Sequence, residues 1–314
     1  MTTPVRVAPA VAAALRDGRP VVALESSVFA QGLPQPENRD AARRMLAAVR
    51  ARGAEPAITA VAKGTPVVGL DGDDLERFLA KGGVSKISAR DIAPAAVAQA
   101  DGATTVAGSL ALAHAAHIVV LATGGIGGVH RVAPTPGADT VRDESADLAE
   151  LACTPMVVVC AGAKTILDLP GTMERLESLG VAVVGYRVDE LPGFLTSGTG
   201  ISLSWRFESA AEVAAAWRMQ RALGRAQAIV VVQPPPLPLP RALVDDAVNR
   251  ALDAAARAGI AGTALTPWLL ARLEEETGGA SLATNVALLE SNAALAAEIA
   301  QEVARGVEIG RARA

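Results

Sequence analysis

The sequence predicts a layered α/β/α fold with a largely parallel central sheet and a helical C-terminal region, built as a single domain over residues 1–314. Two observations carry this prediction. Short, uniformly apolar runs alternate with helical stretches, and long amphipathic helices take over after Pro240. A strand covered by helices on both sides is apolar throughout, because neither of its faces meets water. Regular alternation of such strands with helices is typical of α/β proteins.

The elements are taken in chain order. A surface helix is expected within Met1–Leu15. Valine- and isoleucine-rich runs predict buried strands at Val21–Leu24, Pro66–Leu70, Ile118–Ala122, Met156–Ala161, Val181–Tyr186 and Ile229–Val232. Helices are predicted at Pro36–Arg52, Pro94–Gln99, Leu110–Ala116, Glu144–Ala152, Ile166–Leu179, Ala210–Leu223, Ala242–Ala258, Pro267–Glu276 and Leu282–Arg305. Residues 233–240 (QPPPLPLP) fit a rigid loop that leaves a strand, or a polyproline segment for a partner domain.

Composition and charge exclude several protein classes. With 51% hydrophobic and 20% charged residues, the chain is not a disordered one. Its formal net charge of -4 predicts no nucleic-acid partner. The apolar runs end well before the roughly 20 residues that a membrane helix needs, so no membrane association is predicted. Cys153 and Cys160 are too few for a disulfide scaffold, and the start of the chain lacks a signal-peptide pattern, so we expect a cytoplasmic protein.

Lysine is rare enough to be informative. Of 29 basic residues only Lys63, Lys81, Lys86 and Lys164 are lysines. Lysine can lose its proton and act as a nucleophile, whereas arginine stays charged. Lys164 follows the predicted strand Met156–Ala161 and is expected to enter a helix at the carboxyl edge of the sheet, where α/β proteins bind ligands. Lys164 is therefore either a catalytic amine or a structural lysine at a strand end, and Lys86 could be a second cation that lowers its pKa.

Two further segments carry residues suited to a site. Glu25 ends the first strand, which suits general acid/base work, although a salt-bridged glutamate is an equal alternative. The glycine-rich stretch 122–131 (ATGGIGGVHR) follows another strand, and its backbone N–H groups with His130 and Arg131 suit a phosphate or sugar. The alternative is a tight turn between a strand and a helix.

An acidic stretch offers a metal site. Asp143 and Asp147 are four residues apart, so they share one face if the helix has already begun. Mg²⁺ and Mn²⁺ often use one or two such carboxylates and complete their shell with water. The alternative is a first helical turn rich in acids, which the helix dipole favours.

Taken together, eight segments resemble one family, the pseudouridine-5′-phosphate glycosidases, over essentially the whole chain. They are Val22–Gly32 (VALESSVFAQG), Val84–Asp91 (VSKISARD), Gly102–Ala107 (GATTVA), Ala122–Arg131, Ser145–Leu148 (SADL), Val159–Leu169 (VCAGAKTILDL), Thr266–Leu270 (TPWLL) and Thr277–Asn292 (TGGASLATNVALLESN). The chain departs from the family pattern at Gln31, where histidine is usual, and in the stretch 132–142, which is longer than usual.

The resemblance implies reversible cleavage of the C–C glycosidic bond of pseudouridine 5′-phosphate to uracil and ribose 5-phosphate, in a homotrimer that binds one Mn²⁺ per subunit. By motif, the nucleophile that forms a Schiff base with the opened ribose is Lys164, the proton donor is Glu25 and the metal ligand is Asp143. Substrate contacts are implied at Lys86, Val106, Thr123, His130, Ser145, Ala146, Asp147 and Asn285. Two other functions stay open: a C-glycosynthase or C-glycosidase for another base or aromatic acceptor, and a non-catalytic sugar-phosphate sensor.

Overall fold

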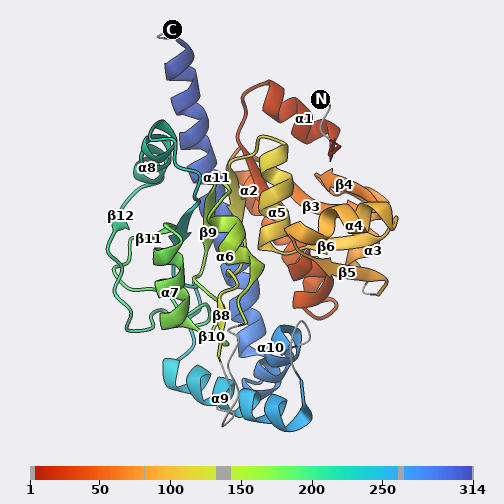
Figure 1. Cartoon of the computed structure of the whole chain (residues 1–314), viewed down its shortest axis with the longest axis vertical. Helices are drawn as coiled ribbons and strands as arrows, with labels where there is room; N and C mark the ends of the chain where they lie inside the picture. The colour runs from red at the N-terminus through yellow and green to blue at the C-terminus, as the bar shows by residue number, and fades with distance from the viewer. Residues whose placement is uncertain (1–3, 81, 132–142, 261–264, 313–314) are drawn as a thin grey trace.

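A computed structural model describes residues 4–80, 82–131, 143–260 and 265–312. Its centre is an eleven-stranded sheet with the order β1-β4-β3-β2-β7-β9-β13-β11-β12, to which β6 and β5 are added beside β3. Helices cover both faces of this sheet (Figure 1). The predicted α/β/α layers, the largely parallel sheet and the helical C-terminal region are confirmed.

The parallel part of the sheet matches the predicted apolar runs. Its strands are β2 (Val21–Leu24), β7 (Val120–Ala122), β9 (Val157–Cys160), β13 (Ile229–Val232), β11 (Ala182–Tyr186) and β12 (Arg206–Phe207). All neighbours in this series pair in parallel. Every residue of β2, β7, β9 and β13 is buried, which explains why these strands are apolar at consecutive positions instead of alternate ones.

The strand β3 (Glu55–Ala62) joins this sheet to a mixed extension, of which the sequence predicted one strand, Pro66–Leu70. Its first half pairs in parallel with β2, and its second half pairs antiparallel with both β4 (Thr65–Val68) and β6 (Asp101–Thr104). The strand β5 (Val84–Ile87) lies parallel to β6, and β1 (Arg6–Val7) lies parallel to β4. β6 has the sequence DGAT, whose small and polar residues give no apolar signal.

Two helical layers enclose the sheet. On one side α11 (Ala280–Ala312) packs against α2 (Glu37–Ala51), α8 (Ala210–Ala222) and the strands β2, β7 and β9. On the other, α5 (Val106–Ala115) packs against α6 (Ala146–Leu151) and β3. In Figure 1, α11 runs the length of the molecule behind the strands while α5 and α6 lie in front. The remaining helices are α1 (Pro9–Arg16), the π-helical η1 (Val28–Gly32), α3 (Gly72–Leu79), the 3₁₀ turn η2 (Ala89–Asp91), α4 (Ile92–Val97), α7 (Leu169–Ser178), α9 (Arg241–Ala258) and α10 (Leu265–Glu276).

Several predicted helix starts were wrong, and side-chain caps explain two of them. α6 begins at Ala146 because the Ser145 hydroxyl accepts the Asp147 backbone N–H, and α7 begins at Leu169 because Asp168 accepts from Gly171. Residues before α7 instead form the short strand β10 (Leu167–Asp168), which pairs with β8 (Val129–His130). At the N-terminus, residues 1–3 lie outside the described part, and a strand at β1 precedes the predicted helix.

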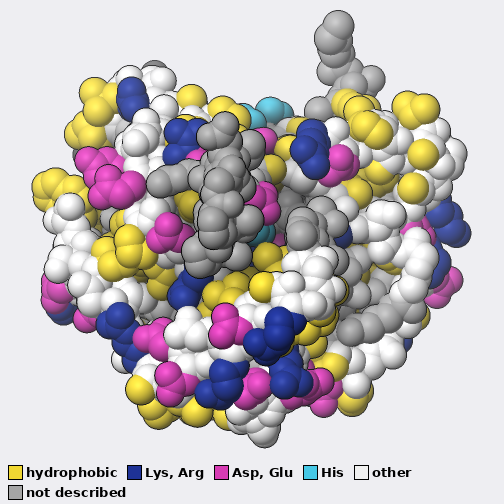
Figure 2. Space-filling view, turned by 60° about the horizontal axis from the view of Figure 1, so that its bottom comes forward, with side chains coloured by type: hydrophobic (Ala, Val, Ile, Leu, Met, Phe, Trp, Pro, Cys, Tyr) yellow, Lys and Arg dark blue, Asp and Glu magenta, His cyan; other side chains and the backbone are white. Residues whose placement is uncertain are grey.

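The C-terminal region closes the lower end of the molecule in Figure 1 with α9 and α10. Residues 233–240 form the irregular connection from β13 to α9, held where Leu239 N–H donates to the Leu195 carbonyl (2.8 Å) and Thr284 donates to the Leu237 carbonyl (2.7 Å). On the face shown in Figure 2, acidic and basic side chains are interspersed. In the part of the chain that the structure describes, every helix is too short or too polar to cross a membrane.

Candidate active site

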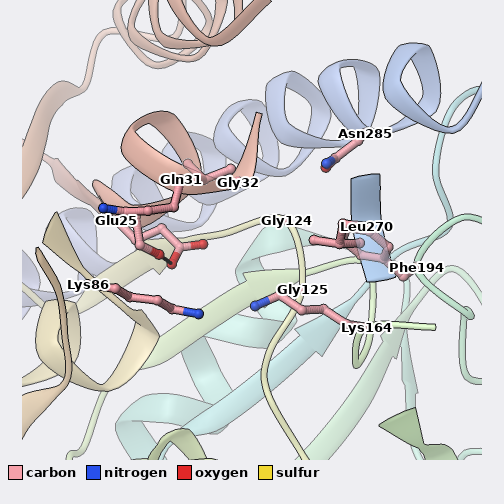
Figure 3. A pocket seen from close by; sticks show the side chains of 12 residues that line it. Glu25, Gln31, Gly32, Lys86, Gly124, Gly125, Lys164, Phe194, Leu270 and Asn285 are labelled. Carbon is pink, nitrogen blue, oxygen red and sulfur yellow. Dashed lines mark hydrogen bonds between the residues drawn. The ribbon is translucent and has the colours of Figure 1, made fainter. Parts of the chain in front are cut away.

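A pocket opens where β2, β7 and β9 end (Figure 3). It holds about 490 Å³ of empty space, part of it open to solvent. The residues that line it are Glu25, Ser27, Val28, Gln31, Gly32, Lys86, Gly124, Gly125, Lys164, Phe194, Leu270 and Asn285. Four of the residues implied by resemblance, namely Glu25, Lys86, Lys164 and Asn285, therefore meet at one cavity, although they come from distant parts of the chain.

Glu25 is held by two hydroxyl groups. Its side chain is buried, with 4% of the residue exposed. The Thr123 hydroxyl donates to Oε1 (2.5 Å) and the Ser27 hydroxyl donates to Oε2 (3.0 Å). Each carboxylate oxygen is thereby fixed, so Glu25 has one defined position at the edge of the pocket.

The two lysines enter the pocket from opposite sides and their amines point toward one another (Figure 3). Lys86 comes from β5 and Lys164 from the loop after β9. Burial among protein atoms and the nearby charge of Lys164 lower the pKa of the Lys86 amine, while Glu25 and Asp147 oppose this shift. Lys86 as a whole is an exposed residue, because it lies at the wall of an open cavity. The surroundings thus disfavour the charged form of the Lys86 amine.

Lys164 sits in an irregular loop, and the expectation that it enters a helix was wrong. The loop turns sharply at Gly162, which has a φ of +92° and would place a Cβ 2.3 Å from the Pro192 carbonyl oxygen. The Lys164 N–H then donates to the Ile126 carbonyl (3.1 Å), and the Thr165 hydroxyl donates to the Gly193 carbonyl (2.8 Å). The lysine is therefore fixed by contacts with the glycine-rich stretch and the 190–201 loop, without help from a helix.

The glycine-rich stretch is tied to α5 and α6 by Asp147. This buried carboxylate accepts the backbone N–H of Ala107 (2.9 Å) and that of Gly127 (2.8 Å). A Cβ at Gly127 would lie 2.2 Å from the Ser145 hydroxyl, so only glycine fits there. Of the implied substrate contacts, Val106, Ser145, Ala146 and Asp147 group around these two helix N-termini and His130 lies beside them, whereas none of the five lines the pocket.

Asp143 precedes α6, so it does not share a helix face with Asp147 as the spacing suggested. Its carboxylate is 60% exposed and pairs with His130 Nδ1 at 2.9 Å. The stretch 132–142, whose length departs from the family pattern, lies outside the described residues. Within the described part of the chain, no three His, Cys, Asp or Glu side chains gather as a metal site. The residues present fit an ion that takes Asp143 as a single protein ligand and fills its other positions with water.

Some pocket residues were not singled out from sequence. Ser27 donates to Glu25, and Phe194 brings a ring against Gly125, where a Cβ would lie 2.7 Å from it. Phe194 adopts a positive φ of 65°, which is rare for an aromatic residue and has no signal in the sequence. Thr123, predicted as a substrate contact, is fully buried behind Glu25 and does not line the pocket.

Comparison with known proteins decides the family. The family model described as "Indigoidine synthase A like protein" matches residues 10–302. The chain is 57% identical over 295 residues to a protein from Gemmatimonas aurantiaca named pseudouridine-5′-phosphate glycosidase, covering 93% of this chain and 94% of that relative. The chain belongs to the pseudouridine-5′-phosphate glycosidase family. A second member, from Herpetosiphon aurantiacus and with the same name, is 49% identical over 94% of this chain and 96% of its own length.

Solved structures of the family share the fold. The prealnumycin C-glycosynthase AlnA, determined in complex with ribulose 5-phosphate, is 37% identical with a TM-score of 0.88, covering 98% of this chain and 99% of that one. An indigoidine synthase A-like protein from Thermotoga maritima is 32% identical with a TM-score of 0.85, covering 96% and 97%. One protein to which this chain is similar is thus a C-glycosynthase that binds ribulose 5-phosphate.

Proposed function

We propose that this protein cleaves the C–C glycosidic bond of pseudouridine 5′-phosphate reversibly, giving uracil and ribose 5-phosphate. The observation that carries the proposal is the convergence of the Lys164 and Lys86 amines with Glu25 in one pocket. The close relatives with this name support the choice of substrate.

The leaving group explains why an amine is needed. An ordinary glycosidase expels an oxygen, which a carboxylic acid protonates readily. Here the departing atom is a ring carbon of uracil, which is a much poorer leaving group. Lysine provides covalent catalysis that divides this difficult step into easier ones.

The proposed sequence of bonds is as follows. The C1′–O4′ bond of the ribose opens and O4′ takes a proton from Glu25, while Lys164 Nζ, as the free amine, bonds to C1′ and passes one of its protons back to Glu25. The lone pair of this nitrogen then expels the base as the bond from C1′ to uracil C5 breaks, and C5 receives a proton. Water hydrolyses the resulting iminium, releases ribose 5-phosphate and restores the amine. Glu25, fixed between the hydroxyls of Thr123 and Ser27, supplies and accepts these protons.

Borohydride trapping tests the proposal. Incubation with ribose 5-phosphate and borohydride, followed by peptide mapping, is expected to show a reduced adduct on Lys164, and added uracil should give pseudouridine 5′-phosphate. Lys164→Ala should abolish both, whereas Lys63→Arg, at the exposed β3–β4 turn, should change neither. Sugar-phosphate binding with no adduct would favour the sensor function instead.

We further propose one Mn²⁺ per subunit at Asp143. When bound, the ion would organise water and phosphate oxygens beside the site. The exposed carboxylate and its neighbour His130 support this placement. Asp143→Ala should weaken Mn²⁺ binding measured by calorimetry, while Asp245→Ala, an exposed aspartate on α9, should leave it unchanged. A cytoplasmic homotrimer is proposed from the family resemblance, and light scattering of the purified protein tests the trimer.

A second candidate function is C-glycoside synthesis with another acceptor. It is favoured by the likeness to AlnA and by Gln31, which lines the pocket where the family usually has histidine. Gln31 donates to the Val84 carbonyl (3.0 Å) at the start of the strand that carries Lys86. If this candidate holds, the protein forms the ribose 5-phosphate adduct but does not couple it to uracil.

A further inference from the structure

A single buried amide on α11 reaches the ends of two strands. Asn292 is 1% exposed, and its Nδ2 donates to the backbone carbonyls of Thr123 (2.8 Å) and Gly124 (3.3 Å) after β7. Its Oδ1 accepts from the Gln233 side chain (2.9 Å), directly after β13. Because β9 lies between β7 and β13, Asn292 spans the end of the strand that leads to Lys164.

Helix stability does not explain this residue. The neighbouring buried positions Leu288, Leu289 and Leu295 on α11 are apolar. Asparagine is a poor helix former, and a buried amide costs free energy unless its hydrogen bonds are made. The side-chain hydrogen bonds of Asn292 all go to groups outside α11. The amide therefore connects α11 to the ends of the strands.

The contacts of Asn292 lead to both catalytic groups. Thr123, whose carbonyl it holds, donates through its hydroxyl to Glu25 Oε1 (2.5 Å). The Gly124 carbonyl, which it also contacts, accepts the N–H of Ala161 (2.9 Å) at the base of the Lys164 loop. Asn292 does not line the pocket, so any effect on the reaction passes through these groups.

We propose that Asn292 is a positioning residue that fixes Glu25 relative to Lys164, by holding the Thr123–Gly124 backbone between the two. This inference rests on the proposed function. Proton transfer between Glu25 and the sugar or base requires a defined distance, and a misplacement of about 1 Å costs about 10²-fold in rate.

Steady-state kinetics with a matched control test the proposal. In Asn292→Ala, kcat for pseudouridine 5′-phosphate cleavage should fall about 10- to 100-fold while KM changes less than about threefold, because only the transition state loses an interaction. The ribose 5-phosphate adduct on Lys164 should still form. Thr284→Val is the control, because it removes one buried hydrogen bond from the same helix to a loop, between the Thr284 hydroxyl and the Leu237 carbonyl. It should lower the melting temperature and leave kcat within about twofold of wild type.

A double-mutant cycle separates positioning from general loosening. Thr123→Val removes the hydroxyl that Asn292 acts through, so the double variant should be no slower than the slower single variant. Fully additive losses, or a kcat loss no larger than that of Thr284→Val, would overturn the proposal. If Asn292→Ala does not fold, Gln233→Ala serves instead, because it removes the side chain that donates to Asn292 Oδ1. This variant should lower kcat about threefold or more at constant KM. An unchanged kcat would overturn the proposal. A wild-type protein without adduct or turnover would refute the proposed function instead.

Discussion

Asp147 provides a stability test that needs no substrate. Its buried carboxylate joins α6 to α5 through the Ala107 N–H and to the glycine-rich stretch through the Gly127 N–H, at 2.9 and 2.8 Å. Asp147→Asn preserves the size of the side chain and one acceptor oxygen. The new NH₂ group, however, must face one of the two backbone N–H groups, so that one hydrogen bond is lost and two donors meet in a buried position.

The expected cost follows from these contacts. A hydrogen bond to a charged group contributes about 1.5–3 kcal/mol, and a buried N–H left without an acceptor costs about 1–3 kcal/mol. These two costs describe in part the same lost hydrogen bond and are not simply added. We therefore expect the free energy of unfolding to fall by about 3 kcal/mol. Urea unfolding followed by circular dichroism measures it, with the m-value checked for constancy.

A matched aspartate gives the comparison. Asp245 pairs with Arg241 at 3.3 Å on the surface of α9, with 46% of its side chain exposed. Asp245→Asn should cost less than about 1 kcal/mol, because exposed ion pairs contribute little. If Asp147→Asn also stayed within about 1 kcal/mol of wild type, the two backbone contacts would not be the anchor that we infer.

Three further predictions concern lysine and cysteine side chains. Lys164→Ala removes a cation that lowers the pKa of Lys86, so this pKa should rise toward its ordinary value of 10.5, which the pH dependence of reductive methylation of Lys86 measures. Since the folded state holds the pKa of Lys86 below that of the unfolded chain, the charged form of this amine opposes folding at neutral pH, and this penalty is relieved as the pH rises toward 10.5. Lys86→Met should therefore raise the free energy of unfolding at pH 7 and raise it less at pH 10, and equal gains at both would contradict the shift. Burial raises the pKa of the Cys160 thiol to about 12 while Cys153 is exposed, so a thiol reagent should modify Cys153 alone until urea unfolds the chain.

The parallel strands were predictable because burial on both faces leaves a direct mark on the sequence. β9 and β13 are short runs of apolar residues, and their length and their valine and isoleucine content favour a buried strand over a buried helix segment. β3 gives a weaker mark because it begins with Glu-Pro and changes partners at its middle, parallel to β2 at first and then antiparallel to β4 and β6. Its identity as a strand depends on those partners, which the local sequence does not reveal.

The site was predictable wherever a residue simply follows a buried strand. Glu25 and Lys164 follow β2 and β9, and the edge at which parallel strands end is shared. The relation between Asp143 and Asp147 was not predictable, because it depends on where α6 begins. The Ser145 hydroxyl decides that start. A helix that began three residues earlier, at Asp143, would place both aspartates on one face, whereas in the structure Asp143 is exposed and Asp147 is buried.

The sequence raised the possibility that Lys86 is a second cation beside Lys164, but how the two lysines meet needed the three-dimensional structure, since they belong to different parts of the sheet. Lys86 is carried by the β5–β6 pair, which joins the main sheet through the second half of β3. Ser26 links this pair to the strand ends at the pocket, since its hydroxyl accepts the Thr104 N–H of β6 (2.9 Å) and donates to the Thr59 carbonyl of β3 (2.7 Å). Ser26 directly follows Glu25 in the chain. Its two hydrogen bonds therefore hold the β5–β6 pair, which carries Lys86, next to Glu25. The place of Lys86 beside Lys164, whose charge helps to lower the pKa of Lys86, therefore depends in part on a contact between residues 78 positions apart.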